Sequence, residues 1–284
     1  MRSWLFVPAD RPSMIAKARR AGADAVIIDL EDSVAPEAKP VARDACRAAL
    51  DMERDGVQLW VRINALASGL AEADIAAVMA GRPDGLVLPK ALGGACVQQL
   101  ATLTDAVGAA CPPVLAIATE TASALFGLGS YGGLGNTLAG LAWGAEDLSA
   151  DLGSATSRDG DGRLTGPYAL ARNLMLAGAV AAGVQPVDTV WTDIRDLAGL
   201  EAECLAAQRD GFTGKMAIHP AQVPVINRCF TPSAEDIAMA RRIVDAFRNA
   251  PGSGVVALDG RMVDVPHLKR SERILARAAA FGAG

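Results

Sequence analysis

Acidic residues gather in this chain where short aliphatic segments end. They are Asp29, Glu31, Asp32, Glu120, Glu146, Asp147 and Asp193. If those segments are parallel strands, their ends meet at one face, where so many carboxylates would repel one another without a counter-charge. Arg62 and Lys90 also stand at segment ends, and a bound cation would complete the compensation. The pattern predicts a divalent cation bound by carboxylates at that face.

The histidine content narrows the choice of metal. The chain has only two histidines, His219 and His267, so a histidine-based zinc site is not expected. Oxygen ligands favour Mg2+, with Mn2+ as the alternative, and water and substrate would complete the coordination shell.

Eight short aliphatic segments end in a polar or charged residue. They are Trp4–Pro8, Ala25–Glu31, Gln58–Asn64, Gly85–Lys90, Val114–Glu120, Leu141–Asp147, Val187–Asp193 and Lys215–Pro220. Most of the gaps between them hold Ala- and Leu-rich stretches with charges at helical spacing. Such strand–helix alternation predicts a parallel sheet, and eight repeats predict an α/β fold of the closed (β/α)8 TIM barrel type. Active sites of such barrels lie at the carboxyl ends of the strands.

Local signals mark the ends of helices and the longer loops. Asp10 is expected to cap the first helix, with Pro12 in its first turn and Gly22 after its last periodic residue. The stretch Ser154–Gly166 is rich in Gly, Asp and Arg and is expected to be a mobile loop at the barrel mouth. The Gly-rich stretch Gly127–Gly135 matches no phosphate-loop spacing, so a flexible connection is favoured over a phosphate cradle.

The chain continues well beyond the eighth segment. Residues 1–227 are expected to form the TIM barrel and residues 228–284 a C-terminal extension. A helix over Ser233–Ala250 is followed by the hinge Pro251–Gly254 and by a basic helix from Pro266. A barrel is complete without this segment, so we interpret it as a C-terminal helical arm or lid, or an oligomer arm, and not as a second domain.

Composition excludes several classes of partner. Of 284 residues, 51% are hydrophobic and 4% aromatic, which suits aliphatic parallel strands covered by helices. The net charge of -5 argues against nucleic acid, and no apolar run approaches the length of a membrane span. The five cysteines form no CxxC pair, which fits a reducing compartment. The expectation is a cytoplasmic protein with small-molecule ligands.

Seven ordered motifs carry a resemblance that spans nearly the whole chain. They are Arg2-Ser3-Trp4-Leu5-Phe6-Val7-Pro8, Asp29-Leu30-Glu31-Asp32-Ser33-Val34, Val61-Arg62-Ile63-Asn64, Leu88-Pro89-Lys90, Glu120-Thr121-Ala122, Gly144-Ala145-Glu146-Asp147-Leu148 and Ile218-His219-Pro220-Ala221-Gln222. Together they resemble the citrate lyase beta subunit and malyl-CoA lyase family, within the wider HpcH/HpaI aldolase superfamily. The fold of that family is a TIM barrel.

The resemblance implies roles for residues of the barrel. Glu120 and Asp147 match the two acids that hold Mg2+, and Arg62 matches the arginine that contacts substrate oxygens. The coenzyme A contacts map onto Arg11 and onto the segment that contains His219 and Pro220.

The resemblance also implies a role for the C-terminal extension. In the family this arm reaches a neighbouring subunit of a trimer and offers an aspartate to its active site. Asp264 lies in the matching segment, Gly260 to Pro266. We therefore expect a homotrimer or hexamer in which Asp264 serves as the acid or base at carbon.

The implied activity is a Mg2+-dependent carbon–carbon lyase. It would cleave or form a 3-hydroxyacyl thioester such as citryl-, malyl- or citramalyl-CoA, giving a keto acid and an acyl thioester. Alternatives are a citrate lyase beta subunit that acts on a carrier-protein thioester and a metal-free aldolase that forms a Schiff base on Lys90. A catalytically idle barrel is disfavoured, since it need not keep Arg62, Glu120, Asp147 and Asp264.

Overall fold

The computed structural model describes residues 1–54 and 56–282, and its centre is a closed barrel of eight parallel strands. The strands are β1 (Ser3–Pro8), β2 (Ala25–Asp29), β3 (Gln58–Arg62), β4 (Gly85–Leu88), β5 (Val114–Ile117), β6 (Leu138–Ala142), β7 (Gln185–Asp188) and β8 (Gly214–Ala217). Each pairs with the next along the chain, and β8 closes the barrel by pairing with β1. The predicted α/β TIM barrel is confirmed.

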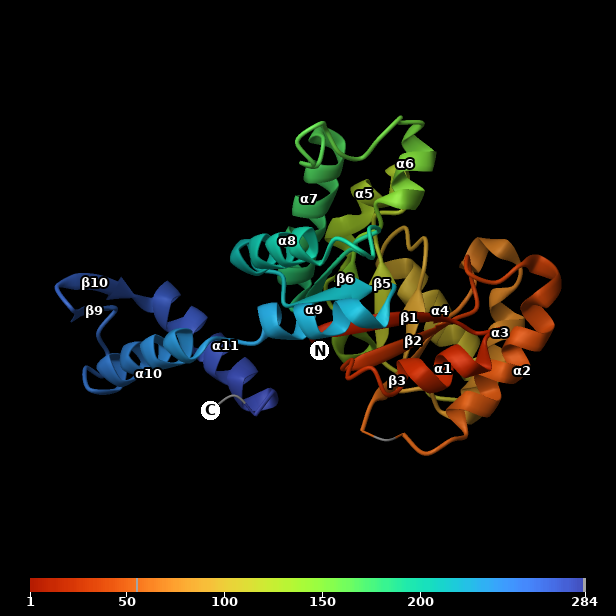
Figure 1. The fold of residues 1–284 in the computed structure, drawn as a ribbon. Helices are drawn as coiled ribbons and strands as arrows, with labels where there is room; N and C mark the ends of the chain where they lie inside the picture. The colour runs from red at the N-terminus through yellow and green to blue at the C-terminus, as the bar shows by residue number, and fades with distance from the viewer. Residues whose placement is uncertain (55, 283–284) are drawn as a thin grey trace. The chain divides into compact units, whose positions relative to one another are not determined.

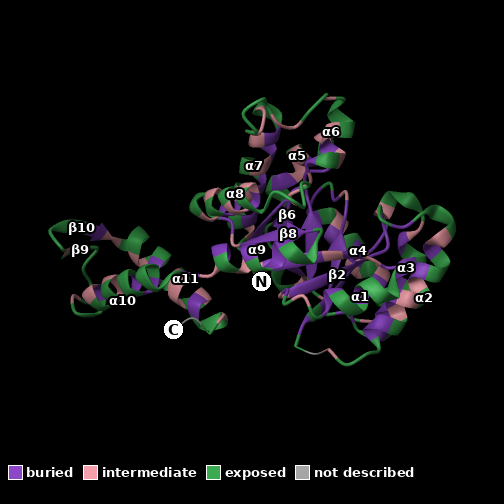
Figure 2. Ribbon diagram, in the orientation of Figure 1, coloured by how far each residue is buried: buried purple, intermediate pink, exposed green. Residues whose placement is uncertain are grey.

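Helices surround this barrel (Figure 1). They are α1 (Pro12–Ala18), α2 (Lys39–Leu50), α3 (Ala71–Val78), α4 (Gly94–Ala106), α5 (Ala122–Gly127), α6 (Glu146–Leu152), α7 (Gly166–Ala182), α8 (Leu197–Asp210) and α9 (Val223–Phe230). Figure 2 shows the strands as buried and the outer helix faces as exposed, as expected for parallel strands covered on both faces. No helix of the described residues is both long and apolar enough to cross a bilayer.

Two tryptophans fill part of the barrel interior. Trp4 and Trp60 are each 1% exposed and meet edge to face, with ring centroids 4.8 Å apart. Gly85 makes room for the second ring, because a Cβ at that position would lie 2.3 Å from Trp60 ring atoms. Smaller aliphatic side chains such as Val87 and Leu115 complete the packed core. These side chains therefore fill this part of the barrel interior.

The observed bounds correct several of the predicted ones. Strand β6 begins at Leu138, three residues before the predicted start, and β2 to β8 each end two to five residues before the predicted end. Glu31 and Glu120 consequently stand in loops that follow β2 and β5. Asp10 does not cap α1: the helix starts at Pro12 with Arg11 at its N-cap and no side-chain capping bond. Before the helix begins, the chain forms a turn in which the Arg11 N–H donates a hydrogen bond to the Pro8 carbonyl.

The start of the Gly-rich stretch after β5 packs closely against the segment at Leu92–Gly94. A Cβ on Gly127 would lie 1.8 Å from the carbonyl oxygen of Leu92, and one on Gly94 would lie 2.3 Å from that of Ser130. Gly127 and Gly94 therefore allow two backbone segments to approach each other. The other glycines of the stretch have no such role, because a Cβ on any of them would meet nothing within 4 Å.

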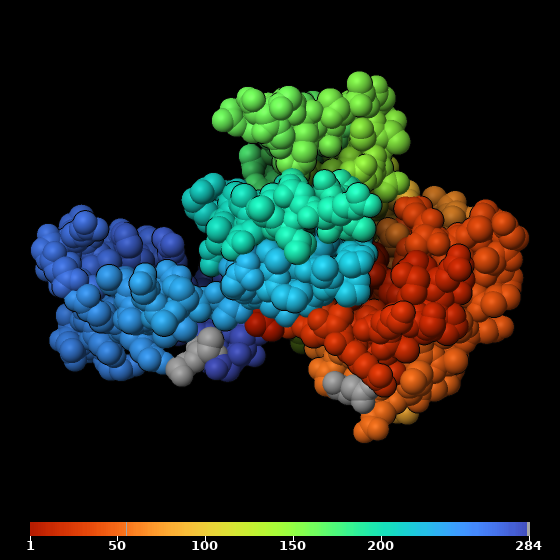
Figure 3. Space-filling model, in the orientation of Figure 1, coloured from red at the N-terminus to blue at the C-terminus, as the bar shows by residue number. Residues whose placement is uncertain are grey.

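The loop between α6 and α7, residues 153–165, lies on the molecular surface (Figure 3, green). Its only regular pairing in the described residues is an isolated bridge between Arg158 and Leu164. Arg158 also forms an ion pair with Glu203 of α8 and stacks over the Trp191 ring, 5.0 Å from its centroid. These contacts tie the centre of the loop to the outer layer of the barrel.

Residues Arg228–Gly284 form a second compact unit, separate from Met1–Asn227. Helices α10 (Ala234–Arg248) and α11 (Val265–Ala280) pack together, and an antiparallel hairpin of β9 (Val255–Leu258) and β10 (Arg261–Asp264) joins them. Ser233 caps α10 by accepting a hydrogen bond from the Asp236 N–H at 3.0 Å. Asp264 is the last residue of the hairpin and stands at the start of α11.

Candidate active site

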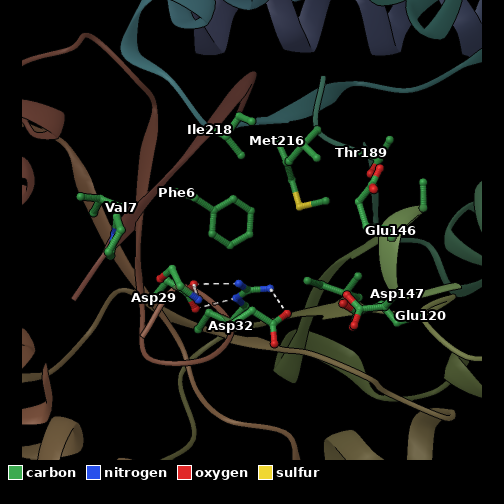
Figure 4. A pocket seen from close by; sticks show the side chains of 17 residues that line it. Phe6, Val7, Asp29, Asp32, Glu120, Glu146, Asp147, Thr189, Met216 and Ile218 are labelled. Carbon is green, nitrogen blue, oxygen red and sulfur yellow. Dashed lines mark hydrogen bonds and ion pairs between the residues drawn. The ribbon is translucent and has the colours of Figure 1, made fainter. Parts of the chain in front are cut away.

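A cavity of about 250 Å³ lies at the carboxyl ends of the barrel strands (Figure 4). Its lining residues are Phe6, Val7, Pro8, Asp29, Asp32, Ser33, Arg62, Ile117, Glu120, Gly144, Ala145, Glu146, Asp147, Thr189, Val190, Met216 and Ile218. Apolar side chains such as Phe6, Met216 and Ile218 lie on one side in Figure 4, with Glu120 and Asp147 facing them. A ligand in this cavity would therefore meet charged groups along one wall and apolar groups along the other.

Arg62 is held in a fixed orientation by the neighbouring strand. It is the last residue of β3 and pairs in register with Asp29, the last residue of β2. Its Nε donates to Asp29 Oδ1 and its second terminal nitrogen to Asp29 Oδ2, both at 2.7 Å. The Phe6 ring covers the guanidinium, 4.8 Å from its carbon. Although burial opposes ionisation, Arg62 holds the pKa of the Asp29 carboxyl below its ordinary value.

Glu31 links Arg62 to Lys90. Its carboxylate lies 3.0 Å from the remaining terminal nitrogen of Arg62 and 2.6 Å from Lys90 Nζ. Burial raises the pKa of Glu31, although Arg62 and Lys90 both act against the rise. Lys90 Nζ also lies 3.1 Å from Asp147 Oδ1. Lys90 is therefore an ion-pair partner of both Glu31 and Asp147.

Glu120 and Asp147 lie together on one wall of the cavity (Figure 4). Glu120 follows β5 and is 3% exposed, whereas Asp147 stands in the first turn of α6 with 34% of its side chain exposed. Burial, reinforced by the nearby charges of Glu31 and Asp147, raises the pKa of Glu120 to about 8, against the hydrogen bond from the Lys90 backbone N–H. A buried carboxyl with this environment favours either a proton or a cation.

Gly144 allows Glu120 to occupy this position. A Cβ at residue 144 would lie 2.7 Å from Glu120 Cγ, so any larger residue would displace the carboxyl. The Gly144 N–H donates to the Thr119 hydroxyl at 3.2 Å, which joins the loop after β6 to the loop after β5. Sequence reasoning quoted Gly144 within a motif but gave it no role, and only the close contact reveals one.

The donor set fits a magnesium ion that keeps several water ligands. Glu120 and Asp147 both offer oxygen atoms, the ligands that Mg2+ prefers, and Mg2+ is commonly held by one or two carboxylates plus water or substrate. Within residues 1–54 and 56–282, no group of three His, Cys, Asp or Glu side chains is arranged as a metal cage. A magnesium ion held by these two carboxylates would take its remaining ligands from water and substrate.

Other predicted residues lie outside the cavity. Asp193 follows β7 by five residues, is exposed, and accepts a hydrogen bond from the Arg195 N–H at 2.9 Å. It serves a local turn, so its expected place among the acids of the barrel mouth is wrong.

The residues expected to bind coenzyme A are exposed. The Arg11 side chain is 65% exposed and lies 3.6 Å from Asp10. His219 Nδ1 accepts the Ala221 N–H at 3.2 Å, and Pro220 begins a short 3-10 helix that ends at Gln222. Their neighbour Ile218 lines the cavity.

Asp264 belongs to the second compact unit, where it pairs with a histidine. Its Oδ1 lies 2.5 Å from His267 Nδ1, and 43% of its side chain is exposed. The hydrogen bond from His267 lowers the pKa of the Asp264 carboxyl. Within its own unit, this carboxylate is charged and accessible.

Comparison with known proteins identifies the family. The family model described as HpcH/HpaI aldolase/citrate lyase matches residues 2–220. The chain belongs to this family. A second model, described as a C-C bond lyase of the TIM-barrel fold, matches residues 168–283. The resemblance seen in the sequence is thus confirmed, as is the prediction of a carbon–carbon lyase.

Individual relatives match along nearly the whole chain. A citrate lyase subunit beta-like protein of Mycobacterium tuberculosis is 39% identical over 281 residues, which cover 97% of this chain and 94% of the relative. A (3S)-malyl-CoA thioesterase of Cereibacter sphaeroides is 35% identical over 288 residues, with 99% and 97% covered. The solved structure of M. tuberculosis CitE with magnesium, acetoacetate and coenzyme A has a TM-score of 0.80 and 38% identity, and the match covers 98% of each chain.

Proposed function

We propose that this protein is a Mg2+-dependent lyase that cleaves or forms the carbon–carbon bond of a 3-hydroxyacyl thioester. The observation that carries the proposal is one cavity in which the Glu120 and Asp147 carboxylates face a guanidinium fixed by Asp29. Such a site combines a place for a divalent cation with a planar donor for oxyanions. Citryl-, malyl- and citramalyl-CoA are the candidate substrates.

Glu120 and Asp147 would hold the ion. A bound Mg2+ polarises carbonyl and hydroxyl oxygens and stabilises negative charge that develops on them. The raised pKa of Glu120 supports this assignment, because its carboxylate lacks a full counter-charge among the protein groups around it. The magnesium in the solved structure of M. tuberculosis CitE adds support from a relative.

Arg62 would orient the carboxylate or keto oxygens of the substrate. Its two hydrogen bonds to Asp29 use two of the five N–H groups of a guanidinium, and its other terminal nitrogen lies 3.0 Å from Glu31 in an ion pair. Because Asp29 fixes the plane of the group, the three N–H groups outside those hydrogen bonds have a set direction before substrate arrives. Preorganised donors of this kind favour the transition state, since they need no reorientation as charge develops.

During cleavage the substrate hydroxyl loses a proton as the ketone forms and the enolate carbon gains one, and synthesis reverses both transfers. We assign the transfer at carbon to Asp264, supplied by a second copy of the chain in a homotrimer or hexamer. Its exposed, ionised carboxylate supports a role as base in the synthetic direction. In the cleavage direction, the Asp264 carboxyl would have to be protonated before it donates a proton to the enolate carbon.

The acyl carrier is proposed to be coenzyme A. Support comes from the printed names of relatives, a malyl-CoA thioesterase and a CitE complex with coenzyme A. Arg11, His219 and Pro220 remain the candidate contacts, and all three are exposed. A carrier-protein thioester is the alternative, as for a citrate lyase beta subunit.

A Schiff base on Lys90 is less well supported. Burial lowers the pKa of Lys90, but Glu31 and the nearby carboxylates outweigh that effect and raise it above its ordinary value. A Schiff-base lysine attacks as the neutral amine, which this environment disfavours. Lys90 is also absent from the residues that line the cavity.

The test is a substrate screen with two readouts. Purified protein is incubated with citryl-, malyl- or citramalyl-CoA and Mg2+, and both keto acid and free thiol are measured. A lyase releases keto acid without free thiol, whereas a thioesterase releases thiol without keto acid. Loss of keto acid release with a chelator, and its return with Mg2+, supports the proposal. Borohydride inactivation in the presence of substrate and chelator would instead support Lys90.

The same screen distinguishes coenzyme A from a carrier protein as the acyl carrier, because the acyl group is offered on both. Activity with the carrier protein alone would overturn the assignment of coenzyme A. Absence of keto acid release from every thioester would overturn the proposed reaction.

A further inference from the structure

Lys90 has a backbone conformation that its residue type disfavours. Its φ is +51°, in the left-handed region where a Cβ meets steric hindrance. Among the described residues only Arg82 and Asp259 share this feature without being glycine, and both are exposed at turns. Lys90 instead stands directly behind the cavity. Strained backbone that persists at such a place calls for a functional reason.

The conformation lets one residue contact both proposed metal ligands. The backbone N–H of Lys90 donates to Glu120 Oε2, while its ammonium lies 3.1 Å from Asp147 Oδ1. The same ammonium bonds to Glu31 Oε1 at 2.6 Å and approaches Asp32 Oδ2 at 3.5 Å. Lys90 therefore gathers carboxylates that come from the loops after β2, β5 and β6.

The charge balance explains why such a residue is needed. Asp29, Glu31, Asp32, Glu120 and Asp147 share the charges of Arg62 and Lys90. Arg62 pairs with Asp29 and also lies 3.0 Å from Glu31, whereas Lys90 contacts Glu31, Asp32 and Asp147. Without a cation the ionised carboxylates among them would repel one another. With a dication bound, the ammonium beside Asp147 would in turn be repelled by it.

We propose that the Lys90 ammonium serves as the counter-charge for the proposed metal ligands when no metal ion is bound. It holds Glu120 and Asp147 together while the site is empty and gives up its contact with Asp147 when the cation binds. After that release, the 2.6 Å contact with Glu31 would still hold the Lys90 ammonium. The inference rests on the proposed function, since it needs Glu120 and Asp147 to be the metal ligands.

Removal of the Lys90 ammonium should change the Mg2+ affinity in one direction. A cation that competes for Asp147 weakens Mg2+ binding, so its removal should tighten binding. We expect Lys90→Met to lower the Mg2+ Kd roughly tenfold, given the strength of charge interactions near a protein surface. The metal-free variant should also melt at a lower temperature than the wild type, with a larger rise on adding Mg2+. A purely structural lysine would give the lower melting temperature without the tighter binding.

Release of Lys90 can be observed directly, because the chain has only five lysines. They are Lys17, Lys39, Lys90, Lys215 and Lys269. In protein labelled with ¹³C and ¹⁵N at lysine, the signal missing from Lys90→Met identifies Lys90. We expect its Cε and Nζ signals to shift on addition of Mg2+, while the signal of the exposed Lys17 stays in place. In metal-free Asp147→Asn, the Lys90 signal should already be displaced from its wild-type position.

The controls separate this inference from the proposed function. Lys17→Met makes the same change of charge on the exposed face of α1 and should leave the Mg2+ Kd unchanged. If Lys90→Met does not fold, Lys90→Gly removes the same ammonium and relieves the left-handed φ. Calorimetry that shows no Mg2+ binding by the wild type would overturn the proposed function and this inference together. Mg2+ binding with an unmoved Lys90 signal, or with equal or weaker affinity in the Lys90 variants, would overturn only the inference.

Discussion

Asp29 and Arg62 end neighbouring strands at the same level of the barrel, and the carboxylate of one accepts two 2.7 Å hydrogen bonds from the guanidinium of the other. The pairing follows from the parallel register of β2 and β3. It makes Arg62 a rigid planar donor, and three N–H groups of its guanidinium lie outside the two hydrogen bonds to Asp29. An arginine at this position therefore supplies direction as well as charge.

Arg62→Lys should fail although it keeps the charge. An ammonium cannot make two parallel bonds to Asp29 and still present donors at a fixed angle. We expect kcat/KM to fall by at least about 100-fold, the scale for losing one preorganised oxyanion donor. Mg2+ binding should be almost unchanged. If the lysine variant keeps most of the wild-type kcat/KM, Arg62 is only a counter-charge.

Glu120→Gln and Asp147→Asn should each abolish or strongly weaken Mg2+ binding while the fold survives. Each change removes one of two charged oxygen ligands and adds no bulk. Isothermal titration with Mg2+ measures the effect, and circular dichroism monitors the fold. Asp193→Asn is the matched control, because Asp193 is exposed and outside the cavity. Undiminished binding in both site variants would remove the assignment of these ligands.

Glu120 should also make the stability of the metal-free protein depend on pH. Its pKa rises from 4.5 to about 8 on folding, so the folded state binds a proton more tightly than the unfolded state. The stabilisation is full below pH 4.5 and is lost as the pH rises towards 8. In a chelator, the melting temperature of the wild type relative to Glu120→Gln should therefore fall between pH 5 and 8. A constant difference across this window would contradict the shift.

The same proton competes with the metal. Below pH 8, Mg2+ must displace the proton from Glu120, so the apparent affinity should weaken by up to about tenfold per pH unit. Calorimetry in buffers of different ionisation enthalpy would report the released proton. Binding without proton release at pH 7 would show that Glu120 is already ionised.

Gly144→Ala tests the packing beneath Glu120. The new Cβ would lie 2.7 Å from Glu120 Cγ, so Glu120 must shift from the position in which its carboxyl accepts the Lys90 N–H. We expect weaker Mg2+ binding in a folded protein. Gly129→Ala is the matched control, since a Cβ there meets nothing within 4 Å. Equal Mg2+ affinity of both variants would show that the position of Glu120 tolerates displacement.

The sequence was sufficient to predict the barrel and the grouping of Arg62, Glu120 and Asp147. Parallel strands place all their carboxyl ends at one face, so residues after successive strands must converge. The hydrogen bonds that side chains make with nearby backbone groups could not be predicted in the same way. Asp193 and His219 also follow aliphatic segments, yet turn N–H groups hold both side chains. The contacts of Lys90 depend on a left-handed φ that no residue pattern indicates.

The last prediction concerns Asp264 and the second compact unit. We expect a homotrimer or hexamer in which Asp264 of one subunit completes the site of another. Asp264 begins α11, so Asp264→Ala would remove both a helix cap and the proposed catalytic group. Asp264→Asn is the better probe, because asparagine is also a strong capping residue but cannot exchange a proton. It should retain Mg2+ affinity and melting temperature while kcat falls by about 100-fold or more, within the range for loss of a general acid or base.

Mixing inactive Asp264→Asn subunits with inactive Glu120→Gln subunits tests whether the site is shared. If Asp264 acts in the site of a neighbouring subunit, some mixed interfaces contain both intact groups and activity returns. If each subunit uses its own Asp264, no mixed assembly has a complete site and activity stays absent. Subunit exchange is established independently with differently tagged copies. Asp264 is the proposed contribution of the second unit to the site, because the acids that line the cavity all belong to Met1–Asn227. Full activity of Asp264→Asn, or no recovery of activity despite proven subunit exchange, would therefore rule out a shared site.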